Sequence, residues 1–357
     1  MDTPQACPSS GDRWYFFRRV FYRGVWPCAP AIVYDECTNI VDTDRYKNSI
    51  TERLRASYYP YRTGTSEVFL RHFLDSFHGI ECVFMYGSML NPGLSTPTSY
   101  PDFYIIVDSY AGFYGSRVHT LLNMVLPPNS YFLELSDNGT SMPSKYCVID
   151  KRDLYRCTHY PHIKDFFISG RLAKRIAILY AKDGEFLSGF IDSVYHAMHF
   201  NVMFALSDLA CTGGFSFDDF MLKLLGLSYR AEVRTETQDK IAGLYAGERD
   251  FYRDVYGKFL EQEILGRTVE KTDGTYRTVR PYFTPGYIAG FISRSRRRAV
   301  YRWPKSIYTF SNYVDYLALK VERTTGENLR LSKWDRRLPL VFGWRHLFRL
   351  LKKKAIR

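Results

Sequence analysis

The chain has 357 residues, 46% of them hydrophobic, and a formal net charge of +12. This length is enough to bury a large core and to form more than one domain. No apolar run reaches eighteen residues, which argues against a membrane-spanning helix. The seven cysteines form no CxxC pair and are odd in number, which suggests neither a zinc site nor a disulfide framework and favours a reducing compartment.

The positive charge is concentrated at one end of the chain. Residues 291–357 contain 18 Lys or Arg against four Asp or Glu, a net charge of +14. The first 290 residues therefore carry a slightly negative charge. We predict that the basic end meets an anionic partner, either phospholipid head groups or nucleic acid.

The first clear elements follow an aromatic, arginine-rich stretch over residues 1–65, which contains no chemical motif and which we predict to be irregular. A helix is predicted over 66–77, where a serine precedes apolar residues at helical spacing. A buried strand over 81–86 runs into a Gly-Ser pair, and a second apolar strand over 103–107 follows a loop rich in Pro, Gly, Ser and Thr.

This pair of strands indicates a nucleotidyl-transfer site. A Gly-Ser turn lets backbone N–H groups approach a triphosphate, and an aspartate on the neighbouring strand holds the metal. Gly87, Ser88 and Asp102 fit these roles. The second carboxylate usual at such a site would stand two residues after Asp102, where the chain has Tyr104, so Asp108 and Glu134 remain as alternative partners.

Further along, we predict a helix over 115–125, a stop at Pro127-Pro128, and strands over 131–135 and 145–149. From 163 to 259 the pattern becomes helical, most clearly over 192–209 and 217–225. The predicted fold class is α/β (α+β), a mixed-sheet domain of the nucleotidyltransferase type followed by a helical domain and a basic amphipathic C-terminal helix. The expected boundaries are an N-terminal extension over 1–65, the nucleotidyltransferase domain over 66–160, the helical domain over 161–280 and a membrane-association segment over 281–357.

Four histidines form a loose cluster along the sequence, at positions 159, 162, 196 and 199. They do not form an HExxH motif or another recognised ligand spacing with a carboxylate. We interpret them as polar residues on loops and helix faces.

The last twenty residues predict an interfacial helix. Apolar residues recur there at steps of three and four, with basic residues around them. Such a helix buries its aromatic face at the acyl boundary while its cations meet anionic lipid. The alternative is a helix packed on the protein's own core. The residues expected to bind the membrane are Trp344, Arg345, Leu347, Phe348, Arg349, Leu351, Lys352 and Lys353.

At this point the chain resembles a known family, the soluble mitochondrial-type phosphatidate cytidylyltransferases, also called translocator assembly and maintenance proteins. Five blocks carry the resemblance, in family order over about residues 66–260. The blocks are Tyr86-Gly87-Ser88, Asp102-Phe103 with Val107-Asp108, Lys145 to Ile149, Ser169 to Lys174, and Gly226 to Tyr229 with Glu232 and Arg234. The family's Gln after Gly-Ser and its Trp-His and His-Tyr-Ser blocks have no clear counterpart, which indicates a divergent, bacterial-type member.

The resemblance implies an Mg²⁺-dependent enzyme that uses CTP and phosphatidate at an anionic membrane surface, with no nucleic acid partner. It places Asp102 and Asp108 as metal ligands and, with Lys145, as catalytic residues. It implies peripheral attachment to the inner face of the cytoplasmic membrane, or to the matrix face of the inner membrane in a mitochondrion. The implied nucleotide contacts are Tyr86, Gly87, Ser88, Arg171, Lys174, Ser228, Tyr229 and Arg234.

Two other functions fit the same residues. A nucleotidyltransferase acting on RNA or protein would use the same Gly-Ser and Asp site, with the basic end on a phosphodiester backbone. A non-catalytic assembly protein would keep the fold and bind CTP without turnover. RNA binding with a steep salt dependence would favour the first, and nucleotide binding without product would favour the second.

Overall fold

The computed structural model describes residues 40–58, 61, 63–91, 100–137, 140–232, 238–309, 318 and 331–337. All of them belong to one compact unit of the chain, residues 35–357. Among the described residues, no helix combines the length and the apolar character needed to cross a bilayer. The C-terminal residues predicted to bind the membrane, 344–353, and Arg234 lie outside the described residues.

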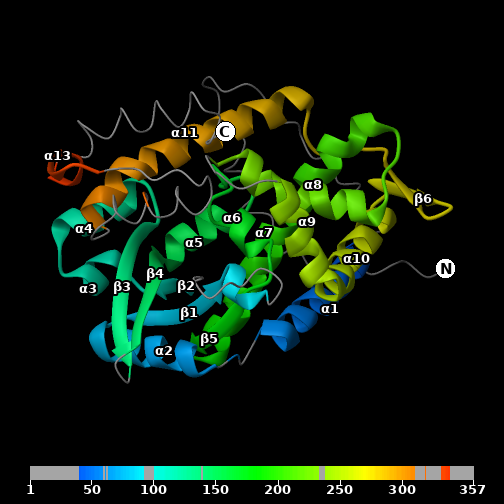
Figure 1. The fold of residues 1–357 in the computed structure, drawn as a ribbon. Coiled ribbons are helices and arrows are strands. Elements are labelled where there is room, and N and C mark those ends of the chain that lie inside the picture. The colour runs from blue at the N-terminus through cyan, green and yellow to red at the C-terminus, as the bar shows by residue number, and fades with distance from the viewer. Residues whose placement is uncertain are drawn as a thin grey trace, which may run out of the picture. The chain divides into compact units, whose positions relative to one another are not determined.

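A five-stranded mixed sheet forms the centre of the fold (Figure 1). Its strand order is β3-β4-β2-β1-β5, in which β2 and β4 are parallel and the other neighbours are antiparallel. The predicted mixed α/β class is therefore confirmed. The strands are β1 (Ile80–Tyr86), β2 (Asp102–Val107), β3 (Asn129–Asp137), β4 (Thr140–Asp150) and β5 (Ala177–Ala181).

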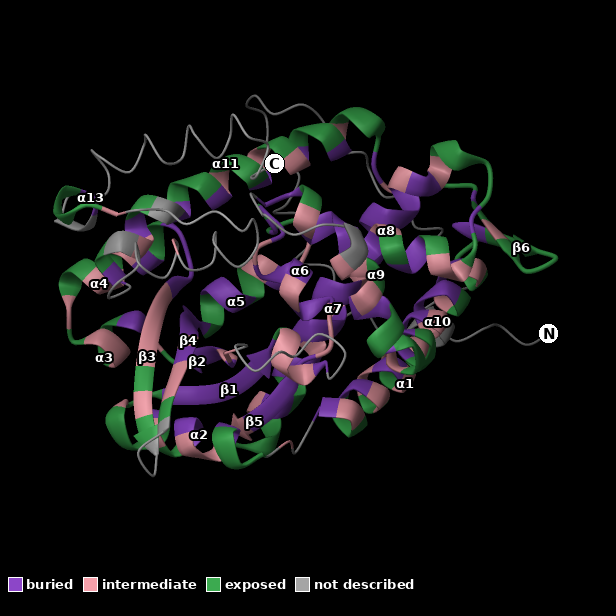
Figure 2. Ribbon diagram, in the orientation of Figure 1, coloured by how far each residue is buried: buried purple, intermediate pink, exposed green. Residues whose placement is uncertain are grey.

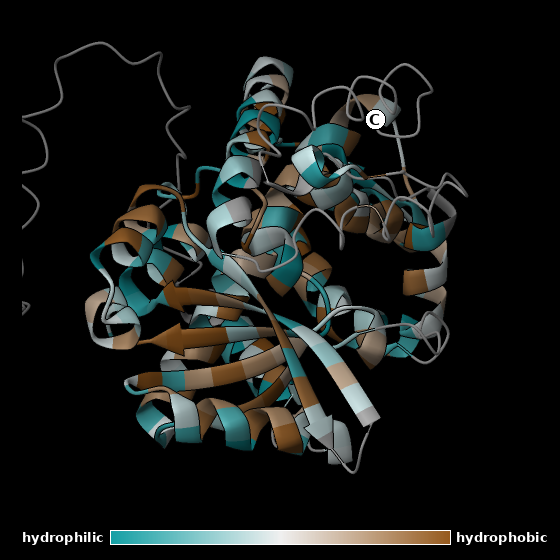
Figure 3. Ribbon diagram, turned by 60° about the vertical axis from the view of Figure 1, so that its left-hand side comes forward, coloured by the Kyte–Doolittle hydropathy of each residue, from teal (hydrophilic) through white to brown (hydrophobic). Residues whose placement is uncertain are grey.

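Both faces of the central strands are covered, which explains why β1 and β2 are nearly continuous apolar runs. Figure 2 shows these strands as buried, and Figure 3 shows them as hydrophobic along most of their length. On one face, Phe69 and Phe73 of α2 (Gly64–Ser76) pack on Phe103 of β2. On the other face, Phe190 of α7 (Gly184–Leu209) stacks on Phe84 of β1, with ring centroids 5.2 Å apart.

The helices and strands predicted between residues 66 and 225 are present, with shifted ends. The first of the predicted helices is α2, which begins after Thr63. The Thr63 side chain accepts a hydrogen bond from the N–H of Ser66 in a capping box. The helix predicted over 115–125 starts two residues late, because Gly115 adopts a left-handed conformation with φ of 58° and ends a short preceding helix that was not predicted. The helices on either side are α3 (Tyr110–Tyr114) and α4 (Arg117–Val125).

Helices make up most of the remainder. The long α7 (Gly184–Leu209) begins at Asp183, whose side chain accepts from the N–H of Phe186. The other elements are α5 (Lys151–Thr158), α6 (Ser169–Leu172), α8 (Phe217–Arg230), α9 (Gln238–Gly247), α10 (Arg249–Leu265), the hairpin β6 (Val269–Thr272) and β7 (Thr275–Thr278), α11 (Pro285–Thr309) and α13 (Lys333–Arg337).

One helix lies where the sequence predicts irregular structure. Residues 40–58 form α1, and its buried residues Ile50, Leu54 and Tyr58 recur every four positions. This helix packs on α10 and α7. The spacing is a helical signal, but polar residues surround it, and only the tertiary contacts show that one face is buried.

Two arginines of the basic C-terminal region form ion pairs inside the fold. Arg302 of α11 is buried, donates to the carbonyl of Pro127, and pairs with Asp165 at 2.9 Å. Arg298 pairs with the same carboxylate at 2.5 Å. The two guanidinium groups hold the pKa of Asp165 below its usual value against the opposing effect of burial. These arginines therefore join α11 to the rest of the unit and are not available to an external anion.

Candidate active site

Three of the predicted site residues meet at one edge of the sheet. Gly87 follows the last residue of β1, Asp102 begins β2, and Lys145 lies on β4. The strand register places Tyr86 opposite Asp102 and Asp102 beside Lys145. The Nζ atom of Lys145 is 3.5 Å from Oδ1 of Asp102, and both side chains are partly exposed. The sheet thus presents a cation and a carboxylate together at an accessible edge.

The glycine turn lies directly against the carboxylate. Gly87 has φ of 95° and ψ of −164°, a conformation that is accessible essentially only to glycine. A Cβ atom at this position would be 3.1 Å from Oδ2 of Asp102. The backbone then turns at Ser88, where the N–H of Leu90 donates to the carbonyl of Gly87. Glycine is needed here for both its backbone conformation and its lack of a side chain.

The turn is anchored from behind by Asn91. This side chain is fully buried and donates through Nδ2 to the carbonyl of Leu244 on α9, at 3.2 Å. Gly247 of the same helix approaches so closely that a Cβ atom there would be 2.4 Å from Oδ1 of Asn91. The helical part of the chain therefore helps to position the Gly-Ser turn.

A second group of predicted residues meets where α6 approaches α8. The Nζ atom of Lys174 donates to Oγ of Ser228 at 3.1 Å and lies 4.3 Å from the centre of the Tyr229 ring. The approach is close, because a Cβ atom on Gly170 would be 2.6 Å from Cβ of Ser228. The sequence blocks 169–174 and 226–229 are therefore neighbours in space.

Arg171 connects the two groups. Its guanidinium makes a bidentate contact with Glu232, at 3.0 and 3.4 Å, and lies 6.0 Å from the centre of the Tyr86 ring. Burial opposes the charge of Arg171, but the Glu232 carboxylate more than compensates and raises the pKa of Arg171 above its usual value. Arg171 is therefore a permanent cation whose charge is largely balanced by Glu232, a partner that was not among the predicted site residues.

The tyrosines at this edge are buried and neutral. Burial, followed by the negative charge of Asp102, raises the pKa of Tyr86 well above its usual value. Tyr104 occupies the position where a second carboxylate was sought, and its ring stacks on Phe84 with centroids 5.0 Å apart. Because Tyr104 is within the apolar packing between sheet and helices, an acid at that position would be buried among aromatic rings.

The structure does not bring Asp108 to this edge. Asp102 and Asp108 lie at opposite ends of β2, six residues and thus about 20 Å apart. Asp108 pairs with Lys151 at 2.5 Å, and the hydrogen bond from Lys151 lowers the pKa of Asp108. An even residue spacing places two side chains on the same face of a strand, but it does not make them neighbours. One metal ion cannot contact both aspartates.

Glu134, the other alternative, lies on β3, which is two strand spacings or about 10 Å from β2. Its carboxylate accepts a hydrogen bond from Ser141 across the hairpin. Of the three acids considered, only Asp102 is beside the Gly-Ser turn.

The donor set at this edge fits Mg²⁺ with one protein carboxylate. Magnesium commonly takes one or two carboxylates and completes its octahedral shell with substrate phosphates and water. The Asp102 side chain is 31% exposed, so a phosphate-bound ion can reach it. Asp102 would hold the ion, and the phosphates would supply further ligands.

A glycine turn and a strand aspartate on a mixed sheet, with cations facing them, are features of nucleotidyltransferases. The family model described as "Phosphatidate cytidylyltransferase, mitochondrial" matches residues 99–307, more than half of the chain. The chain belongs to this family of nucleotidyltransferases, as the sequence motifs predicted. The matched region contains Asp102, Lys145, Arg171 and the α8 residues, whereas the Gly-Ser turn precedes it.

Other comparisons add little. No curated protein shows a significant sequence match. Among solved structures, a nucleotidyltransferase-like protein from Exiguobacterium sibiricum 255-15 aligns over 60% of this chain and 98% of its own, with 8% identity and a TM-score of 0.23.

Proposed function

We propose that the protein transfers CMP from CTP to phosphatidate, forming CDP-diacylglycerol and releasing pyrophosphate in an Mg²⁺-dependent reaction. The family supports the phosphatidate cytidylyltransferase activity. The observation that carries the proposal is the meeting of Gly87, Asp102 and Lys145 at one accessible edge of the sheet.

The reaction requires no protein nucleophile. A phosphate oxygen of phosphatidate attacks the α-phosphorus of CTP, and the bond from that phosphorus to the bridging oxygen breaks as pyrophosphate leaves. The protein must align the two phosphates and balance their charge. Bound Mg²⁺ would supply the largest share of that charge balance.

Each residue has a distinct part in this scheme. The Gly87-Ser88 turn would bring backbone N–H groups to the triphosphate, because the missing side chain permits close approach. Lys145, 3.5 Å from Asp102, would contact a phosphate beside the metal. Lys174 would meet the second phosphate from the α6–α8 side. Arg171 would act as a positioning residue, since its charge already holds Glu232.

The functional test is pyrophosphate release from each of the four nucleoside triphosphates, with and without phosphatidate vesicles and with Mg²⁺ added or chelated. We expect release only when CTP, phosphatidate and Mg²⁺ are all present. Release with another nucleotide, or with RNA in place of lipid, would replace the proposal by the RNA or protein transferase. CTP binding without release would support the non-catalytic alternative.

We further propose that residues 338–357 hold the enzyme on an anionic membrane, as a peripheral protein on its inner face. Deleting them is expected to lower turnover on phosphatidate bilayers at least tenfold and to leave turnover on short-chain, water-soluble phosphatidate within about twofold. Flotation of the protein with anionic liposomes measures the binding itself. An equal loss on both substrates would show that the segment is structural.

A further inference from the structure

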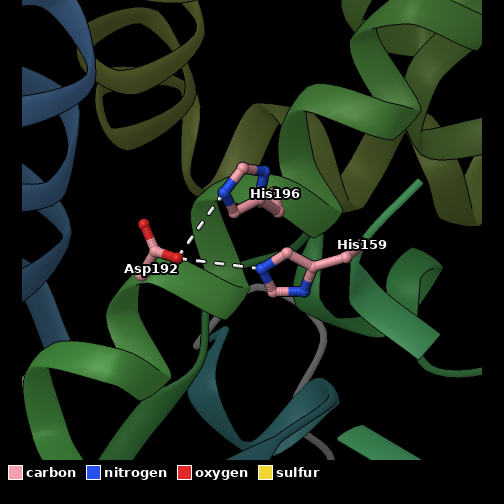
Figure 4. Close-up of side chains that lie close together, drawn as sticks. All are labelled: His159, Asp192 and His196. Atoms are coloured by element: carbon pink, nitrogen blue, oxygen red, sulfur yellow. Dashed lines mark ion pairs between the residues drawn. The ribbon is translucent and has the colours of Figure 1, made fainter. Parts of the chain in front are cut away.

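A group of potential metal ligands lies outside the site described above. His159 is the C-cap residue of α5, and Asp192 and His196 lie four residues apart on α7. One ligand atom from each comes within 4.8 Å of the other two. Figure 4 shows the carboxylate and the two imidazoles turned toward one another. Within the described part of the chain, no other group of three such side chains meets this criterion.

The carboxylate divides its two oxygens between different partners. Oδ2 of Asp192 is 3.7 Å from Nε2 of His159 and 3.5 Å from Nε2 of His196. Oδ1 faces the other way and pairs with Nζ of Lys47 on α1, at 2.5 Å. A tetrahedral ion with bonds of 2.0–2.2 Å separates its ligands by about 3.4 Å. The two observed separations are close to this value.

The orientation of His159 is fixed from behind. Its Nδ1 atom is 3.2 Å from the carbonyl of Tyr155 and 2.9 Å from Oγ1 of Thr158. The Tyr155 carbonyl can only accept, so it pairs with His159 in the tautomer that carries its hydrogen on Nδ1, whereas the Thr158 hydroxyl can pair with either tautomer. Nε2 is then the ring atom available for coordination, and a backbone carbonyl behind the other nitrogen is the usual support of a metal-bound histidine. The Tyr155 ring stacks on His159 with centroids 4.0 Å apart.

Two residues of the set have the spacing of helical metal sites. Side chains four residues apart lie on the same face of a helix, so Asp192 and His196 can share one ion without distorting α7. The sequence-based interpretation found no recognised ligand spacing between these histidines and a carboxylate, and so it missed the aspartate one turn before His196. His159 could be added only by the fold, because it is distant in sequence and reaches α7 through the packing of α5.

We propose that His159, Asp192 and His196 bind one divalent transition-metal ion of the zinc type, in addition to the Mg²⁺ expected at Asp102. Two imidazole nitrogens and one carboxylate oxygen suit Zn²⁺, whereas Mg²⁺ prefers oxygen ligands. Three protein ligands leave a fourth position for water. The ion would join the C-terminal end of α5 to the middle of α7. This inference does not depend on the proposed reaction, because it shares no residue with the Asp102 site.

Lys47 provides the internal test. Its ammonium group occupies Oδ1 of Asp192 and lies near the ring of Tyr195, 5.5 Å from the ring centre. A nearby positive charge opposes binding of a second cation at the same carboxylate. The Lys47→Met variant should therefore bind the ion more tightly than the natural protein, by about tenfold, which corresponds to 1.4 kcal/mol. No gain in Lys47→Met would show that the ion does not bind at this carboxylate.

The experiment uses the full-length protein, stripped of metal with chelator and kept reduced, titrated with Co²⁺ and then with competing Zn²⁺. We expect one Co²⁺ per chain, visible-band absorption typical of four- or five-coordinate nitrogen and oxygen ligands, and displacement by one Zn²⁺. His159→Ala and His196→Ala should each weaken binding at least tenfold. His162→Ala is the matched control, because this exposed histidine lies three residues away and is not in the set; its affinity should be unchanged.

Three results would overturn the proposal. These are no stoichiometric binding in the natural protein, an affinity in His159→Ala and His196→Ala equal to that of the natural protein, or an intense near-ultraviolet charge-transfer band that assigns the ion to cysteine. Thermal unfolding separates folding from binding. Zn²⁺ should raise the midpoint of the natural protein and of His162→Ala. It should not raise that of Asp192→Asn, the conservative variant, whose midpoint without metal confirms that it folds.

Discussion

The two ends of the β1–β2 strand pair carry the same three residue types and differ in what surrounds them. At one end, Gly87, Asp102 and Lys145 meet, with the glycine against the carboxylate and the lysine 3.5 Å away. At the other end are Gly79, Asp108 and Lys151. There the N–H of Asp108 donates to the carbonyl of Gly79 at 2.9 Å, and Lys151 pairs with Asp108.

The difference lies in the neighbours of each set. At the Gly87 end, Arg171 of α6 lies 6.0 Å from the centre of the Tyr86 ring, and Asn91 holds the turn against α9. At the Gly79 end, Asp108 and Lys151 are each 54% exposed, and a Cβ on Gly79 would meet nothing within 4 Å. The comparison shows that residue type alone does not define the site, and it supplies each site residue with a natural control.

The largest difference in turnover between matched variants at the two ends is expected for the aspartates. Asp102→Asn removes the carboxylate that would hold the metal and should lower turnover about 10²–10³-fold. Asp108→Asn should leave turnover within about twofold. Pyrophosphate release at saturating CTP and phosphatidate measures both, and circular dichroism checks that both variants fold. Equal turnover in the two variants would show that Asp102 is not the metal ligand.

The lysines should show a smaller difference. Lys145→Gln removes a charge-assisted contact to a phosphate, worth about 1.5–3 kcal/mol, and should reduce kcat/KM about 10- to 100-fold. Lys151→Gln removes only an exposed ion pair and should change neither kcat/KM nor the unfolding midpoint measurably. Loss of activity in both variants would point to a general effect of positive charge.

The glycines test the geometry of the turn. Gly87→Ala must adopt a strained backbone and crowd Asp102, so we expect about a tenfold loss of kcat/KM together with a loss of about 1–3 kcal/mol in stability. Gly79→Ala also has a positive φ, of 71°, and should lose stability while keeping full activity. If both variants lose activity in proportion to stability, the close approach at Gly87 has no catalytic part.

A buried lysine and an exposed lysine should affect the pH dependence of stability differently. Burial, followed by the nearby Arg302, lowers the pKa of Lys305 to about 7, whereas the hydrogen bond to Asp108 raises the pKa of exposed Lys151. Between pH 7 and 10.5 the unfolded chain binds a proton at Lys305 that the folded protein lacks. Stability should therefore rise with pH over this window, by a few kcal/mol.

Lys305→Met is expected to remove that rise. The variant also loses the hydrogen bonds to the carbonyls of Leu126 and Pro128, so its absolute stability falls above pH 7. The informative quantity is the slope of the unfolding free energy between pH 6 and 10, measured by urea titration. An unchanged slope in Lys305→Met would contradict the lowered pKa, and Lys151→Met serves as the control whose slope should match the natural protein.

Several features of the site could be predicted from the sequence because they are local. Apolar runs identify β1 and β2, Gly87-Ser88 marks a turn after a strand, and Asp102 stands at the start of the next strand. The blocks around Lys145, Arg171 and Ser228 were recognised through their resemblance to a family. None of these inferences required knowledge of which helix covers which face of the sheet.

The partners across the chain could not be predicted in this way. The Glu232 carboxylate can balance the positive charge of Arg171 only because α6 and α8 pack closely together. Their approach leaves no room for a side chain at Gly170. The choice among Asp102, Asp108 and Glu134 depended on strand direction and register. An even spacing between two residues places their side chains on the same face of a strand, but it does not tell at which end of the strand each side chain lies.

The sequence was enough to predict the fold class, the family, and Asp102 as a candidate site residue near a Gly-Ser turn, because short-range spacing and local residue chemistry carry those signals. The fold was needed to show that Asp108 lies apart from Asp102, that Asn91 anchors the turn, and that Asp192 meets His159 and His196. The physical reason is the same in each case. A contact between side chains that are distant in sequence depends on how helices and strands pack, and local patterns do not encode that packing.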